Sequence, residues 1–127
     1  MRQFKGAVMR QSSPIRSTRG FRVQCIEGNV STLVECHGKL TTENAPLLKS
    51  EVKSLIGQKK RIVLDLKNVP LIDSSGLGTI AGLYVSARTG RCEFALINAN
   101  EQIRELLGIS NLLKLFEAAG RHGGRIV

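Results

Sequence analysis

Two stretches of alternating apolar and polar residues lie near the start of the patterned part of the chain. Residues 21–25 place an apolar side chain at every second position, and residues 30–36 repeat this pattern before Gly38. The sequence Glu-Gly-Asn at residues 27–29 separates the two stretches and favours a turn. Since a period of two is typical of half-buried strands, the pattern predicts a hairpin or two adjacent strands.

Helical spacing follows. A helix is predicted from about Pro46, which suits a first turn, to Gly57, with Thr42 or Asn44 as its cap. After a short β-branched strand at residues 61–66, a second helix is predicted from the Asp73-Ser74 pair to about Arg88. The apolar residues of the two predicted helices are Leu48, Val52, Leu55 and Ile56 in the first, and Leu77, Ile80, Ala81 and Tyr84 in the second.

The last third of the chain predicts a strand at residues 91–97 and a third helix. Asn98 and Glu101 have the spacing of a capping box, and Gly108 ends the helix. A short final strand is predicted at residues 112–116. Strands that alternate with helices indicate an α/β fold: a small, mixed, partly parallel β-sheet with crossover helices packed on it.

Charge divides the chain into three parts. The formal net charge is +9, but six basic residues lie in the first 22 positions and two in the last seven. The remaining 11 basic residues are balanced by all 10 acidic ones. We therefore predict a basic, disordered leader at residues 1–20, a folded domain at 21–117 and a glycine-rich tail at 118–127. A nearly neutral body argues against direct nucleic-acid binding.

Contact of the leader with a membrane surface is an alternative role for that segment, because Met1, Phe4 and Val8 have helical spacing. No apolar stretch approaches the roughly 20 residues that cross a bilayer.

Chemistry-bearing residues are few. Cys25, Cys36 and Cys92 are isolated, so we expect no disulfide framework, no metal site and a reducing, cytoplasmic setting. The two histidines, His37 and His122, have no partner at catalytic spacing, and we expect neither an enzyme nor a cofactor.

The start of the second predicted helix is the unusual place. Asp73 or Ser74 could simply cap the helix. Alternatively, the unpaired amides and the dipole of the first turn could stabilise a phosphate carried by a serine there. Gly78 and Gly82, four residues apart, would let another backbone approach the helix closely.

A wider comparison favours the second interpretation. The strand Ile-Val-Leu-Asp-Leu at residues 62–66, followed by Asp-Ser-Ser-Gly-Leu-Gly at 73–78, resembles the signature of the STAS domain family (sulfate transporter and anti-sigma factor antagonist). The likeness covers residues 30–116 and includes Gly-Lys-Leu at 38–40, Leu-Leu at 106–107 and Ser-Asn-Leu at 110–112.

This resemblance implies a bacterial anti-sigma factor antagonist, a phosphoprotein of transcription regulation. Ser74 would accept phosphate from an ATP-binding anti-sigma factor serine kinase. The unphosphorylated protein would sequester that kinase and release a sigma factor, and a PP2C-type phosphatase would restore the unphosphorylated form. The resemblance also implies a partner-binding surface made of Asp73, Ser74, Ser75, Gly76, Leu77, Gly78, Thr41 and Gly82.

Two features depart from the family pattern. Thr41 stands where soluble antagonists usually have an aspartate, and little chain remains for the family's last helix. The alternative function is a non-enzymatic STAS adaptor subunit of a stress-sensing or membrane lipid-transport complex, in which Ser74 serves mainly as a cap.

Overall fold

A mixed β-sheet forms the centre of the computed structural model, which describes residues 11–12, 15–18, 20–109 and 124–126. The strands pair in the order β1-β3-β4-β5-β6-β7, and β2 pairs with the same strand β3 as β1 does. The strands are β1 (Gln11–Ser12), β2 (Arg16–Thr18), β3 (Phe21–Glu27), β4 (Ser31–His37), β5 (Arg61–Asn68), β6 (Glu93–Ile97) and β7 (Gly124–Ile126).

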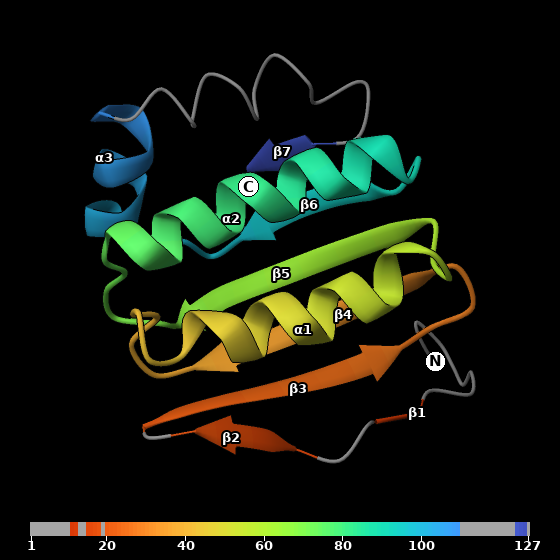
Figure 1. Cartoon of the computed structure of the whole chain (residues 1–127), viewed down its shortest axis with the longest axis horizontal. Coiled ribbons are helices and arrows are strands. Elements are labelled where there is room, and N and C mark those ends of the chain that lie inside the picture. Colours follow the sequence, from red (N-terminus) through yellow and green to blue (C-terminus); the bar gives the residue numbers. More distant parts are fainter. Residues whose placement is uncertain (1–10, 13–14, 19, 110–123, 127) are drawn as a thin grey trace.

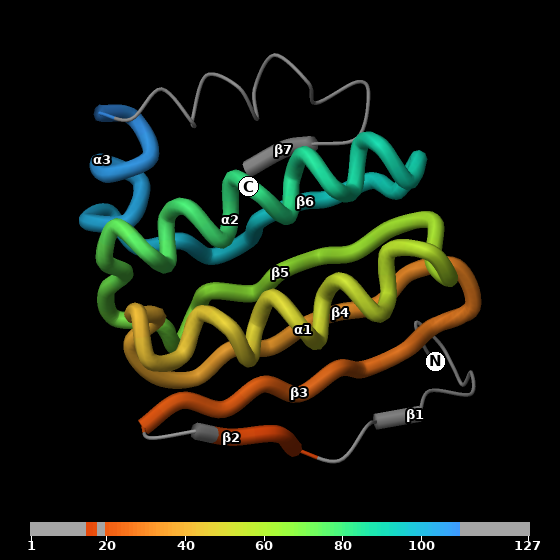
Figure 2. The backbone as a smooth tube through the Cα atoms, in the orientation of Figure 1, coloured from red at the N-terminus to blue at the C-terminus, as the bar shows by residue number. Residues whose placement is uncertain are grey.

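Antiparallel and parallel pairings divide the sheet. The β3–β4 pair is the antiparallel hairpin expected from the alternating pattern, whereas β4–β5, β5–β6 and β6–β7 are parallel. Parallel neighbours need crossover connections, which the helices provide. The backbone trace shows β5 running through the middle of the sheet (Figure 2), as its β-branched sequence predicts.

The helices are α1 (Ala45–Ile56), α2 (Ser74–Thr89) and α3 (Glu101–Ile109). The first two lie side by side across one face of the sheet, and α3 lies beyond the start of α2 (Figure 1). Since α1 follows β4 and α2 follows β5, both helices begin at the same end of the sheet.

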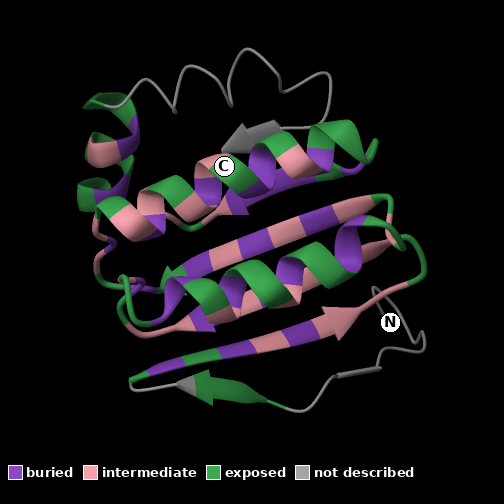
Figure 3. Ribbon diagram, viewed as in Figure 1, coloured by how far each residue is buried: buried purple, intermediate pink, exposed green. Residues whose placement is uncertain are grey.

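The hydrophobic core lies between the sheet and helices α1 and α2. Along β5 every second residue from Ile62 to Leu66 is buried, and the alternation is visible on the ribbon (Figure 3). Val34, Leu64 and Leu96 are lateral neighbours on three adjacent strands and are all fully buried. Burial of one such side chain contributes about 1.5–3 kcal/mol, so the central strands anchor the fold.

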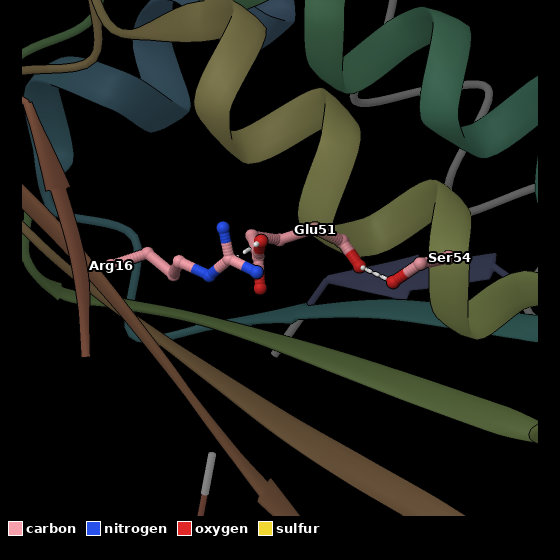
Figure 4. Close-up of polar contacts among 3 residues, drawn as sticks. All are labelled: Arg16, Glu51 and Ser54. Carbon is pink, nitrogen blue, oxygen red and sulfur yellow. Dashed lines mark hydrogen bonds and ion pairs between the residues drawn. The ribbon is translucent and has the colours of Figure 1, made fainter. Parts of the chain in front are cut away.

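The N-terminal strands differ from the predicted leader. Residues 16–18 pair with residues 21–23, and residues 11–12 pair with residues 26–27, so part of the segment predicted to be disordered forms the edge of the sheet. An ion pair of 3.5 Å between Arg16 on β2 and Glu51 on α1 ties this edge to the helical layer (Figure 4). The division of the chain at residues 20 and 117 stays a prediction.

Two local predictions need correction. Helix α2 buries Gly76, Ile80, Leu83, Tyr84 and Ala87, while the expected core residues Leu77 and Ala81 are only half-buried.

The cap of α3 is Asn100 and not Asn98, because the Asn100 side chain accepts the amide of Ile103 at 2.8 Å. Asn98 instead has a positive φ of 61° in the preceding loop.

The predicted strand at 112–116, the apolar residues of the leader and the departure at the family's last helix lie outside the described residues. A strand that was not predicted, β7, occupies residues 124–126 within the predicted tail.

Candidate functional site

Two loops meet at the carboxyl ends of β4 and β5. Leu40 and Ile72 form a parallel bridge, the Leu40 amide donates to the Leu71 carbonyl at 3.1 Å, and the Asp73 amide donates to the Leu40 carbonyl at 3.2 Å. These bonds hold the loop before α1 against the loop before α2. The Asp-Ser-Ser sequence is thereby fixed beside Thr41 and Thr42.

Asp73 is the cap of α2, as one of the two sequence interpretations proposed. One carboxylate oxygen, Oδ1, accepts the Gly76 amide at 2.9 Å, and the other, Oδ2, accepts the Thr42 amide at 3.1 Å and the Thr42 hydroxyl at 3.4 Å. The Gly76 amide is the largest cause of a lowered pKa of Asp73, with smaller contributions from Thr42 and from the Ser75 amide, while desolvation opposes them. The carboxylate is therefore ionised at neutral pH.

Thr42 is a site residue that the sequence analysis considered only as a cap of α1. Besides its bonds to Asp73, its hydroxyl lies 2.8 Å from the Ser75 hydroxyl. Asn44 occupies the cap position of α1, but its side chain makes no hydrogen bond to an amide of the helix. The side-chain amide of Asn44 donates instead to the Lys39 carbonyl at 2.7 Å. The sequence does show that Thr42 is a hydroxyl residue close to the Gly-Lys-Leu sequence at 38–40. The residues around Thr42 do not show that its side chain reaches Asp73.

Ser74 differs from both of its neighbours. It is exposed at the first position of α2, and its hydroxyl makes no hydrogen bond within the described part of the chain. Asp73 and Ser75, in contrast, are both bonded to Thr42. Ser74 is thus the side chain of this segment that is accessible and not committed to a structural contact.

The glycines of α2 serve two different purposes. Gly76 is buried, and a Cβ atom there would lie 2.5 Å from the Leu40 carbonyl oxygen, so this glycine permits the close contact of helix and loop. Gly78 and Gly82 are exposed, and a Cβ atom at either would meet nothing within 4 Å. No backbone of the described residues packs on Gly78 and Gly82, so the expectation that another backbone approaches them closely stays a prediction.

Gly78 and Gly82 instead line a groove between α1 and α2, which we call the α1–α2 groove. It has a volume of about 550 Å³, begins at Thr42 and Ser75, and carries Lys49 and Lys53 on its α1 side.

The predicted partner-binding residues are distributed unevenly around this groove. Ser75, Gly78 and Gly82 line it, whereas Gly76 is buried against Leu40, and Leu77 is half-buried against the core. Thr41 is half-buried, and its carbonyl accepts the amides of Asn44 and Ala45 at 2.9 and 2.7 Å.

The described part of the chain holds no group of three or more metal-ligating side chains. None of the helices described there has the length and apolar character that a membrane span requires. Cys25, Cys36 and Cys92 are buried free thiols, and burial raises the pKa of each, for Cys25 to about 11. Protonated, buried thiols are poor nucleophiles.

A mixed sheet with two crossover helices on one face, and an Asp-Ser pair at the start of the second, places the chain among small α/β domains. The family model of the STAS domain matches residues 21–123. The chain belongs to the STAS domain family.

The matching proteins include named antagonists. An anti-sigma F factor antagonist from Paenibacillus polymyxa is 32% identical over 85 residues, which cover 65% of this chain and 73% of the relative.

The solved structure of the unphosphorylated anti-sigma factor antagonist SpoIIAA superposes with a TM-score of 0.62 at 15% identity, over 83% of this chain and 86% of SpoIIAA. SpoIIAA of Bacillus has also been solved in its phosphorylated form.

A sulfate transporter family protein from Wolinella succinogenes has a similar fold, with a TM-score of 0.65, 17% identity and coverage of 78% and 80% of the two chains.

Proposed function

We propose that this protein is an anti-sigma factor antagonist whose binding to an anti-sigma factor kinase is switched by phosphorylation of Ser74. The observation that carries the proposal is the exposed and uncommitted hydroxyl of Ser74 between two hydrogen-bonded neighbours. A kinase can reach this hydroxyl without breaking a hydrogen bond among the described residues. The similarity to named antagonists supplies the partner class.

The switch is electrostatic in this proposal. A phosphate on Ser74 adds about −1.5 to −2 charges directly beside Asp73, which its hydrogen bonds keep ionised. Like charges brought together in a desolvated interface oppose binding, and each 1.4 kcal/mol lost weakens an affinity about tenfold.

The start of α2 stabilises a phosphate on Ser74 only to a limited extent. The amides of Gly76 and Ser75 already act on the Asp73 carboxylate. The positive end of α2 is therefore largely occupied by the cap, and the modification changes the surface charge and leaves the fold as it is.

The remaining parts of the proposal follow from this scheme. The protein itself performs no chemistry: the kinase transfers the phosphate and a PP2C-type phosphatase removes it. Buried, unpaired cysteines fit a reducing compartment, so we assign the protein to the bacterial cytoplasm.

A quantitative pull-down with Ser74→Ala and Ser74→Glu baits in a lysate of the native host tests the proposal. We expect the alanine bait to retain a small ATP-binding kinase and the glutamate bait to lose at least about a hundredfold in affinity. Ser17→Glu is the matched control, because it adds the same charge to an exposed serine of β2 that does not line the α1–α2 groove.

Incubation of the wild-type protein with the captured kinase and ATP, followed by mass spectrometry, should place one phosphate on Ser74. Equal capture by both Ser74 baits, or phosphate on another residue, would contradict the proposal. Equal capture would instead favour the adaptor function, with Ser74 as part of the helix start only.

A further inference from the structure

The α1–α2 groove has walls of unequal chemistry. Its α2 side presents Gly78 and Gly82, where an added Cβ atom would meet nothing within 4 Å. Its α1 side presents the exposed lysines Lys49 and Lys53. One wall is therefore open to the close approach of a backbone, and the other is cationic.

The lysine charges are not neutralised within the described residues. The side chains of Lys49 and Lys53 make no hydrogen bond or ion pair there. Helix α2 contains no acidic residue, and the acidic residue of α1, Glu51, is bound by Arg16 in a separate pocket that the groove does not share (Figure 4).

This arrangement has a cost for folding. Like charges four residues apart repel each other along a helix and weaken it. Mid-helix glycines weaken a helix as well, and here the two glycines permit no internal contact. Features that lower stability without a contact to compensate them are expected at a binding surface.

We propose that the α1–α2 groove binds an acidic amphipathic helix of the partner protein, with its acidic side chains against Lys49 and Lys53 and its backbone over Gly78 and Gly82. At 1.5 Å per residue the groove spans about 12 Å of α1 and about 17 Å of α2, which suits roughly three turns of a helix. The identity of this partner as an anti-sigma factor rests on the function proposed above.

An acidic occupant also accounts for the direction of the switch. The groove begins at Thr42 and Ser75, which are bonded to each other, and Thr42 binds Asp73. A phosphate on Ser74 would add negative charge at this end. Repulsion between this phosphate and an acidic occupant adds to the repulsion between the phosphate and Asp73, whereas a basic occupant would be attracted to the phosphate.

The test uses a defined probe in place of the natural partner. A stapled amphipathic helix of about fourteen residues, with glutamates on one face and leucine and alanine on the other, is titrated into the ¹⁵N-labelled full-length protein. We expect amide shifts at Lys49, Lys53, Gly78 and Gly82. A peptide with lysine in place of glutamate should cause no such shifts.

Charge reversal at the groove supplies the matched variants. K49E/K53E should weaken binding of the acidic peptide by roughly tenfold or more. K60E/K67E changes two exposed lysines at the ends of β5 by the same total charge, and it should leave binding unchanged. Gly82→Leu, which fills the groove from an open position, should abolish binding while the amide spectrum of the folded protein persists.

Several outcomes would overturn the proposal: no shifts up to millimolar acidic peptide, equal shifts with the lysine peptide, or equal losses in both double variants. Tighter binding of a single-stranded oligonucleotide to the same residues would assign the groove to nucleic acid instead. The titration needs no kinase, so its result is independent of the Ser74 pull-down, and either proposal can fail alone.

Discussion

Alanine substitution at two glycines of α2 should change stability in opposite directions. Gly82 lies in the exposed interior of the helix, and an added methyl group meets nothing within 4 Å. Because alanine favours a helix over glycine by about 1 kcal/mol, Gly82→Ala should raise the free energy of unfolding by about that amount.

Gly76→Ala gains the same helix propensity but meets a fixed backbone. Its Cβ atom would lie 2.5 Å from the Leu40 carbonyl oxygen, 3.0 Å from the Leu40 side chain and 3.3 Å from Ile72. The carbonyl cannot withdraw easily, because it accepts the Asp73 amide and belongs to the bridge that joins the two loops. Overpacking costs about 1–3 kcal/mol, and a 2.5 Å contact with a fixed backbone oxygen belongs in the upper part of that range, at about 2–3 kcal/mol. After the gain of about 1 kcal/mol in helix propensity, we expect a net loss of about 1–2 kcal/mol.

Urea denaturation followed by circular dichroism measures both variants. The free energies of unfolding should differ by about 2–3 kcal/mol, which at an m-value of about 2 kcal/mol/M separates the two midpoints by about 1–1.5 M. If Gly76→Ala is stabilised as much as Gly82→Ala, α2 does not begin in tight contact with Leu40, and the geometry derived for the site is wrong.

Three further predictions concern other parts of the fold. Because its hydrogen bonds lower the folded pKa of Asp73, the stabilisation by this carboxylate is present above about pH 4 and is lost as the pH falls through the folded pKa. Between pH 7 and pH 3 the melting temperature of Asp73→Asn should therefore fall by less than that of the wild type. Equal decreases in melting temperature would refute this. Gly38→Ala should unfold at clearly lower urea concentration than wild type, because Gly38 has a φ of +110° and a Cβ atom there would collide with the Gly20 carbonyl; an unchanged midpoint would contradict that contact. The native thiols, including Cys25 with its pKa raised to about 11, should react with Ellman's reagent at pH 8 far more slowly than a cysteine introduced at exposed Ser50, and rapid reaction of the folded wild type would argue against their burial.

Local patterns were sufficient for most of the elements between Phe21 and Leu107. Strand β5 and helices α1 and α2 were predictable because burial on one face imposes a period of two or 3.6 that any reader of the sequence can detect. The cap at Asp73 was predictable for a related reason, since a cap and the amide it binds lie within one turn of each other.

The contacts that join distant segments depended on the tertiary structure. Thr42 reaches Asp73 across 31 positions of sequence, and this follows only from the parallel pairing of β4 and β5. The short strands β1 and β2 carry too few residues for a periodic signal and are defined by their pairing with β3.

The sequence by itself determined the order of the elements from β3 to α3, the α/β class and the Asp-Ser helix start, because these depend on neighbours within a few residues. Only the tertiary structure decided that Ser74 is free while Ser75 is bonded, and that Gly76 is packed while Gly78 and Gly82 are open. Only the tertiary structure places Lys49 and Lys53 in the same groove as Gly78 and Gly82. The physical reason is that such properties depend on what lies opposite a residue in space, and the pairing of the strands determines this.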